Sequence, residues 1–228
     1  MIGIIASMDE ELYLIKKEMK DLKEKDIKGS RYFIGSIKDK KIAAVKCLTG
    51  KVAMACTAQK LIDNFEPELI INCGVAGGLK KGIDVGDVVL STKTVQSDMD
   101  VTQLGYEVGC VPDIDVTYFE QDRRFNEIAE GIKDDFDFGV YFGNILTADK
   151  FVSNNKDKEY LIKTFDGYCT DMETASLAQV CHINDIPFAG IRGISDSADE
   201  GASTDFKENL RKASDNCAKL LIAVLKKM

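Results

Sequence analysis

The sequence predicts an α/β protein with three layers, in which helices cover both faces of a central mixed β-sheet. Short apolar runs alternate with amphipathic segments along the whole chain, a pattern typical of sheets connected through helices. The chain of 228 residues, 45% hydrophobic and 30% charged, is long enough to bury a substantial core. No repeat, low-complexity tract or linker interrupts it, so we expect residues 1–228 to form a single domain.

The first half begins with an apolar run at residues 2–6, which predicts a buried strand. Ser7 then predicts a helix cap, with Glu10 three residues later in the capping-box position. Apolar residues recur at helical spacing from there as far as Leu22. The elements expected next are strands at 32–37 and 42–48, a helix at 51–65 that ends before Pro67, and a strand at 69–73.

The second half begins with a glycine-rich segment, residues 74–87, which we expect to be a loop after the preceding strand. The elements expected after it are a strand at 88–91, a long irregular loop at 96–119, a helix at 122–132, a strand at 140–145, a second loop, a helix within TDMETASLAQVCHIN (170–184), a strand at 188–194 and a final helix at 205–226.

Composition excludes several classes of function. The formal charge of −8 argues against nucleic acid as the main partner, because binding phosphates needs clustered Lys and Arg. No apolar run approaches the roughly 20 residues that cross a bilayer, and the start lacks a basic leader. Seven cysteines are scattered without a C-x-x-C pair. We therefore expect reduced thiols in a cytoplasmic protein, and no metal site.

A single histidine, His182, limits the catalytic chemistry. Every scheme that uses a histidine base must pass through it, and no nucleophile motif surrounds it. We interpret His182 as a surface residue near the end of a helix. If the protein is an enzyme, carboxylates are the expected proton carriers.

Four predicted strands end in loops of small and acidic residues: IGIIASMDEE, IINCGVAGGL, GNILTADKF and AGIRGISDSAD. Ligands bind beyond the carboxyl ends of strands in open α/β sheets, so these loops are expected to form one site. Asp196 is either a turn residue or a general acid whose pKa burial raises. Glu11 is either a first-turn helix charge or a catalytic base, and Phe151 either a core residue or a surface that stacks on a flat ligand.

Two further segments allow more than one interpretation. Asp171 and Glu173 either favour the start of a helix, or Glu173 points into a pocket and holds the hydroxyls of a sugar. The cluster of Gly74, Gly77 and Gly78 lacks the G-x-G-x-x-G spacing of dinucleotide-binding loops. We expect these glycines to allow close approach of the backbone to a small ligand.

Five motifs in order along the chain carry a resemblance to a known family: M-D-E-E, C-G-V-A-G-G-L followed by G-D-V-V, D-x-D-V-T-x-x-G-Y-E-x-G, D-M-E-T-A and R-G-I-S-D-x-A-D. Together they resemble the bacterial 5′-methylthioadenosine/S-adenosylhomocysteine nucleosidases of the purine nucleoside phosphorylase superfamily. The resemblance implies a nucleoside phosphorylase-like fold and hydrolysis of the bond between adenine and a 5′-thio-substituted ribose. It also implies no cofactor, a role in methionine salvage and a homodimer.

The resemblance assigns the catalytic acid to Asp196, the water-activating base to Glu11 and an arginine near the water to Arg192. The residues expected to contact the nucleoside are Glu173 and Met172 at the sugar, Phe151, Val152, Ser195 and Gly77 around the base and its acid, Met8 and Phe206 beside the 5′ substituent, and Leu104, Tyr106 and Pro112 from the neighbouring subunit. Two carboxylates suffice for such a reaction, one to protonate the leaving group and one to activate water.

The chain departs from the family pattern at Thr49, Val75, Gln96-Ser97, Lys150 and Asp171. These positions bear on the preferred 5′ group and on rate. The alternatives are a nucleosidase for 5′-deoxyadenosine or futalosine-type substrates, a phosphate-dependent purine nucleoside phosphorylase, a nucleoside-binding module without turnover, and an NAD-dependent oxidoreductase.

Overall fold

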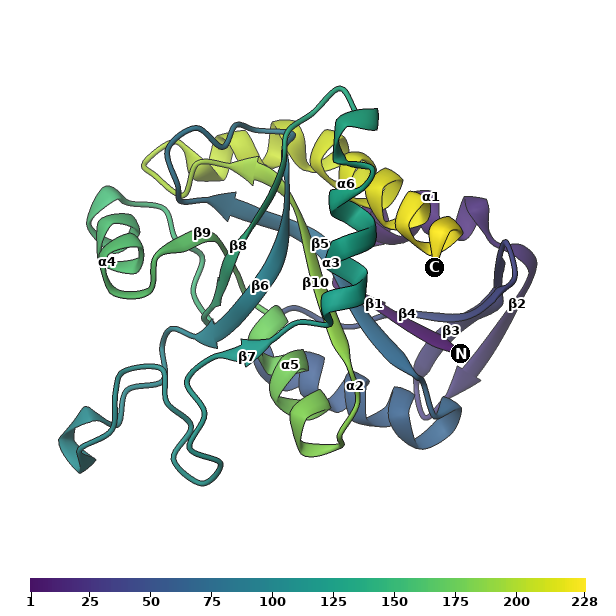
Figure 1. The fold of residues 1–228 in the computed structure, drawn as a ribbon, viewed down its shortest axis with the longest axis horizontal. Coiled ribbons are helices and arrows are strands. Elements are labelled where there is room, and N and C mark those ends of the chain that lie inside the picture. The colour runs from purple at the N-terminus through teal and green to yellow at the C-terminus, as the bar shows by residue number, and fades with distance from the viewer.

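A computed structural model describes residues 1–228 and confirms the predicted α/β architecture around a mixed sheet of ten strands (Figure 1). The strands are β1 (Ile2–Ala6), β2 (Lys20–Ile27), β3 (Ser30–Ile37), β4 (Lys40–Lys46), β5 (Leu69–Gly78), β6 (Val88–Gln96), β7 (Phe119–Glu120), β8 (Val140–Thr147), β9 (Gly167–Asp171) and β10 (Phe188–Asp196). The helices are α1 (Asp9–Glu18), α2 (Lys51–Phe65), α3 (Arg123–Glu130), α4 (Asn155–Phe165), α5 (Thr174–Ile183) and α6 (Ala202–Lys227), with short 3₁₀ turns at Thr102–Leu104 and Lys133–Asp135.

Part of the sheet closes on itself. The strand order is β10-β6-β8-β9-β5-β1-β4-β3-β2, and β10 also pairs with β5. The strands β5, β10, β6, β8 and β9 therefore form a ring, while β1, β4, β3 and β2 extend outward from β5. Parallel pairing joins β4, β1, β5 and β10, and the outer strands β2 and β3 are antiparallel.

Helices cover the sheet on two sides, as predicted. Helix α6 packs against β10, α1 and α3, whereas α2 and α5 pack against each other below the sheet in the view of Figure 1. Strand β1 is apolar throughout because its side chains are buried on both faces of the sheet. Its Ile4 lies in the core that α1 and α6 cover, and the next residue, Ile5, lies in the core that α2 and α5 cover.

Three predicted segments differ from the structure, and the first two are the end of α1 and the second loop. Helix α1 ends at Glu18, and the expected continuation to Leu22 is replaced by β2, whose residues are almost all exposed. Charged side chains are common on edge strands, where they discourage pairing with other chains, and here they resemble the polar face of a helix. The segment expected to be a second loop contains α4 and β9. The Asn154 side chain caps α4 by accepting a hydrogen bond from the Asp157 N–H at 2.9 Å.

The glycine cluster is strand rather than the predicted loop. Strand β5 continues through Gly74 to Gly78, where Gly77 and Gly78 pair with β9 and the preceding residues pair with β10. The strand β10 in turn reaches Asp196, whose partner in the register is Gly77. These pairings fix the backbone beneath the candidate site.

No helix of the structure is both long and apolar enough to cross a membrane.

Candidate active site

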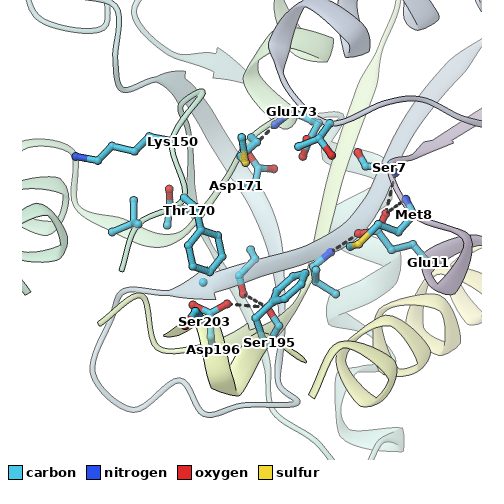
Figure 2. A pocket seen from close by; sticks show the side chains of 18 of the residues that line it. Ser7, Met8, Glu11, Lys150, Thr170, Asp171, Glu173, Ser195, Asp196 and Ser203 are labelled. Carbon is cyan, nitrogen blue, oxygen red and sulfur yellow. Dashed lines mark hydrogen bonds between the residues drawn. The ribbon is translucent and has the colours of Figure 1, made fainter. Parts of the chain in front are cut away.

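A cavity of about 370 Å³ lies where the predicted strand-end loops meet (Figure 2). The residues that line it are Ser7, Met8, Glu11, Thr49, Val75, Ala76, Gly77, Lys150, Phe151, Val152, Thr170, Asp171, Met172, Glu173, Ser195, Asp196, Ser203, Phe206 and Lys207. Four carboxylates of this set are buried, those of Glu11, Asp171, Glu173 and Asp196. Asp171 pairs with Arg192, and the other three come from α1, from the residue before α5 and from the end of β10. Each is held by different partners.

Glu11 lies in the first turn of α1 with 2% of its surface exposed. Its carboxylate accepts hydrogen bonds from the backbone N–H groups of Ser7 at 2.7 Å, Met8 at 2.9 Å and Val75 at 2.9 Å. Burial raises the pKa of Glu11, although the Arg192 charge and these N–H groups oppose the rise. Glu11 rather than Glu10 is the third residue of the helix, and Met8 rather than Ser7 precedes it, so the predicted capping box was wrong by one residue.

Asp196 ends β10 and is 1% exposed. One carboxylate oxygen accepts from the Ser195 hydroxyl at 2.8 Å (Figure 2). The other accepts from the Ala198 N–H at 2.9 Å. Burial raises the pKa of Asp196 above its ordinary value despite these two donors. A β-carbon on Gly77 would lie 2.9 Å from Asp196 Oδ1, so the absence of a side chain there leaves room for the carboxylate.

Glu173 precedes α5 and is 6% exposed. Its Oε1 accepts from the Gly50 N–H at 2.9 Å, and its Oε2 lies 3.9 Å from Arg192 Nη2. Burial, followed by the neighbouring charge of Asp171, raises the pKa of Glu173 to about 7, while Arg192 lowers it. The two interpretations of the acidic pair thus apply to different residues. The Asp171 side chain accepts from the Thr174 N–H at the helix start, and Glu173 lies against the cavity.

Arg192 lies beneath the cavity and does not line it. Its Nε pairs with Asp171 Oδ2 at 2.6 Å, and its Nη2 donates to Thr174 Oγ1 at 2.9 Å and to Asn72 Oδ1. The guanidinium is 2% exposed, and burial opposes its charge, but the carboxylates of Asp171, Glu173 and Glu11 outweigh burial and raise its pKa. Arg192 and Glu11 both reach the space above Gly74, which a β-carbon at that position would fill.

The other residues expected at the site fall into two groups. Phe151 is 44% exposed beside Phe206, with 6.0 Å between the ring centres. The expected residues that line the cavity together with them are Met8, Gly77, Val152, Met172 and Ser195. The expected residues that do not line it are Leu104, Tyr106 and Pro112. These three lie in the long loop between β6 and β7, which projects from the body of the fold at the lower left of Figure 1.

Five residues that line the cavity were not expected there from the sequence: Ser7, Ala76, Thr170, Ser203 and Lys207. Helix α6 starts at Ala202, three residues before the expected position, and its first turns bring Ser203 and Lys207 to the cavity. Thr170 belongs to β9, the strand that was not predicted. His182 is exposed near the end of α5, away from the cavity, as predicted.

Comparisons with known proteins find relatives that match this chain over nearly its whole length. A family model described as "Phosphorylase superfamily" matches residues 1–226. A 5′-methylthioadenosine/S-adenosylhomocysteine nucleosidase from Exiguobacterium sp. is 38% identical, with 100% of this chain and 98% of the relative covered. The crystal structure of the enzyme of that name from Neisseria meningitidis, in complex with methylthio-immucillin-A, superposes with a TM-score of 0.96 at 34% identity, covering 100% and 99% of the two chains. A futalosine hydrolase structure from Helicobacter pylori gives 0.94 at 28% identity, covering 100% and 98%.

The burial of Arg192 leads to a prediction about stability. Arg192 is the cation that offsets the charges of Glu11 and Glu173. Arg192→Leu should lower the free energy of unfolding at pH 7 by about 3–5 kcal/mol, because it leaves buried carboxylates uncompensated. Urea denaturation measures this loss. The double variant Arg192→Leu/Asp171→Leu should be more stable than the single variant, and a single variant as stable as the parent protein would contradict the prediction.

Proposed function

Because this chain belongs to the phosphorylase superfamily and, within it, to the 5′-methylthioadenosine/S-adenosylhomocysteine nucleosidases, we propose that it hydrolyses the N-glycosidic bond of these two nucleosides. The products are adenine and the corresponding 5′-thio-ribose. The observation that carries the proposal is that the carboxylates of Glu11, Glu173 and Asp196, each in a different environment, border one cavity. Hydrolysis of a glycosidic bond needs an acid for the leaving group and a base for water.

We assign the acid to Asp196. Negative charge develops on adenine as the bond breaks, and a protonated carboxyl beside N7 neutralises it. The raised pKa of Asp196 favours the protonated form that this role requires. The Ser195 hydroxyl and the Ala198 N–H fix the orientation of the carboxyl group.

We assign the base to Glu11. Three backbone N–H groups hold its carboxylate in place, so little reorganisation is needed when it accepts a proton from water. The rigidity of this arrangement supports a role at a fixed point in the cavity. In this proposal Arg192 acts from beneath, by keeping Glu11 and Glu173 in position through charge and by pairing with Asp171.

We assign the ribose contact to Glu173, whose ionised carboxylate would accept hydrogen bonds from the 2′ and 3′ hydroxyls. Such charge-assisted bonds strengthen as positive charge grows on the sugar in the transition state. Met172 would lie against the sugar, and Phe151 would stack on the base beside Val152 and Gly77. Met8 and Phe206 would border the 5′ substituent.

The geometry favours water over phosphate as the nucleophile. Arg192, the buried arginine that a phosphate would need, is occupied by Asp171 and Asn72 and does not line the cavity. Lys150 and Lys207 do line it, and Lys150 is paired with Asp157 at 2.6 Å. A phosphate in the cavity would face the carboxylates of Glu11 and Glu173, which repel it when ionised. Futalosine-type substrates are not favoured, because the matching hydrolase is 28% identical, below the 38% of the methylthioadenosine relative.

We also propose a homodimer. Apolar side chains are exposed at the start of α2, at the end of α5 and in the long loop, including Leu48 and Val52 at 76%, Leu104 at 73% and Ile183 at 61%. A second copy covering them would remove this surface from water. Because Leu104, Tyr106 and Pro112 do not reach the cavity of their own chain, we assign them to the partner's 5′ pocket.

The cysteines, all free and six of them buried, support a reducing cytoplasmic location, in which methionine salvage takes place.

Adenine release should proceed in phosphate-free buffer and should depend on the acid. Asp196→Asn should lower kcat by about 100-fold or more, the usual size of a general-acid contribution, while the nucleoside still binds. Adenine formation is followed by chromatography, and binding by calorimetry. A requirement for phosphate with ribose 1-phosphate as product would contradict the hydrolase, and a chain that binds the nucleoside without turnover would indicate a binding module.

The pKa of Glu173 predicts an acid limb in the pH profile. Its pKa of about 7 means that the carboxylate becomes protonated as the pH falls through 7, and the protonated form cannot accept both ribose hydroxyls. KM should therefore rise below about pH 7, and kcat/KM should fall by up to tenfold per pH unit. A 2′-deoxy substrate should show a weaker dependence, and a KM that stays constant between pH 8 and pH 5.5 would refute the assignment.

The homodimer predicts a particle of twice the chain mass in sedimentation equilibrium. Val52→Glu places a charge on the exposed apolar surface of α2 and should shift the equilibrium toward monomer, with a lower kcat/KM at low enzyme concentration. A parent protein that sediments as a stable, fully active monomer would rule the dimer out.

A further inference from the structure

A cluster of charged side chains lies next to the cavity and joins three separate segments. Lys51 Nζ pairs with Asp98 Oδ1 at 2.6 Å, and Asp98 Oδ2 accepts from the Asp149 N–H at 3.0 Å. Asp149 Oδ1 in turn accepts from the Lys51 N–H at 2.8 Å, which closes the cycle. Lys51 starts α2, Asp98 follows β6, and Asp149 lies between β8 and α4. We refer to Lys51, Asp98 and Asp149 as the ion cycle.

The ion cycle fixes the N-terminus of α2, which lacks a cap of its own. Gly50, the residue before the helix, has no side chain to accept from the free N–H groups. Asp149, from another segment of the chain, acts as the cap by accepting from the Lys51 N–H. Its negative charge also interacts favourably with the positive end of the helix dipole. Gly50 has a φ of +98°, and a β-carbon there would lie 3.0 Å from Asp149 Oδ1. A glycine is thus required for this approach.

Two connections link the ion cycle to residues that line the cavity, and a third ties it to α5. The Gly50 N–H, one residue before Lys51, donates to Glu173 Oε1 at 2.9 Å. Asp149 is two residues before Phe151, so the bonds that hold Asp149 also anchor the segment that carries the Phe151 ring. The Ser176 hydroxyl donates to the Lys51 carbonyl at 2.6 Å and ties the same point to α5, the helix that Glu173 precedes.

We propose that the ion cycle is a positioning device that holds the Gly50 N–H against Glu173 and holds Phe151 over the base, so that the ribose and base contacts form together. The proposal rests on the function proposed above. None of the three side chains touches the substrate in it. They act through Gly50 and through the backbone of residues 149–151.

The Gly50 N–H also affects the charge of Glu173. It lowers the pKa of that carboxylate, as Arg192 does, whereas burial and the charges of Asp171 and Glu11 raise it. Loss of the ion cycle would release Gly50, remove a donor from the ionised form of Glu173 and raise its pKa. A merely structural cluster would not move this pKa, so the acid limb of the pH profile distinguishes the two roles.

The test uses three variants, Asp149→Ala, Asp98→Asn and Lys51→Met, in the full-length protein. Each should raise the KM for 5′-methylthioadenosine by about tenfold, since one or two hydrogen bonds lose their geometry. The kcat should fall too, because the Glu173 contacts strengthen in the transition state, but by far less than in Asp196→Asn, since Asp196 and Glu11 are untouched. The acid limb in kcat/KM should move to higher pH. The double variant Lys51→Met/Asp98→Asn should lose no more than the worse single variant, because the two residues act as one unit.

The matched control is the ion pair between Lys133 and Glu130, which has the same N–O distance of 2.6 Å and lies at the end of α3, away from the cavity. Lys133→Met and Glu130→Gln should leave KM and the pH profile unchanged. The positioning role is refuted if the ion-cycle variants keep the parent KM, or if they lose activity uniformly at all pH values. If Asp149→Ala fails to fold, Asp98→Asn and Lys51→Met keep the test complete. Failure of the parent protein to release adenine would overturn the proposed function instead.

Discussion

The buried guanidinium of Arg192 is the interaction on which the candidate site depends. It lies among Asp171, Glu173 and Glu11, and one positive charge cannot offset three ionised carboxylates. The compensation is uneven, because Asp171 takes the short ion pair at 2.6 Å and Glu173 is 3.9 Å away. Asp171 therefore serves the structure, and burial raises the pKa values of Glu11 and Glu173 above their ordinary range because Arg192 offsets it only in part. The same charge balance stabilises the fold and leaves Glu11 and Glu173 with raised pKa values, as is common for functional carboxylates.

Glycines in β5 make this crowding possible. Above Gly74 the space is filled by Arg192 and Glu11, and above Gly77 by Asp196. Because Gly74 and Gly77 lie on one strand that pairs with β10, the base and the acid assigned above are spaced by the strand itself. The glycine cluster therefore has a different role from the one expected of it at Gly74, where side chains of the protein, and no ligand, take the space next to the backbone.

The sequence predicted those parts of the structure that carry a strong local pattern. The run Ile2–Ala6 and the helix Lys51–Phe65 were placed with their observed bounds, since apolar spacing and Pro67 determine them locally. The strand β2 was missed because its charged residues match an exposed helix face as well as a sheet edge. Asp196 and Glu173 were singled out because acidic residues next to apolar segments stand out in a sequence. That Arg192 pairs with Asp171 could not be derived, because it depends on the pairing of strands far apart in the chain.

The closed ring of strands also constrains how the protein folds. Strand β10, from the last fifth of the chain, inserts between β5 and β6 and brings both Arg192 and Asp196. Until it does so, β5 has an unpaired edge and Asp171 has no cation. Pairing over such long sequence separations is slow, and an open apolar edge favours association with other chains. A nascent or truncated chain that stops before β10 is therefore prone to aggregate. The residues of the site come together only when β10 closes the ring.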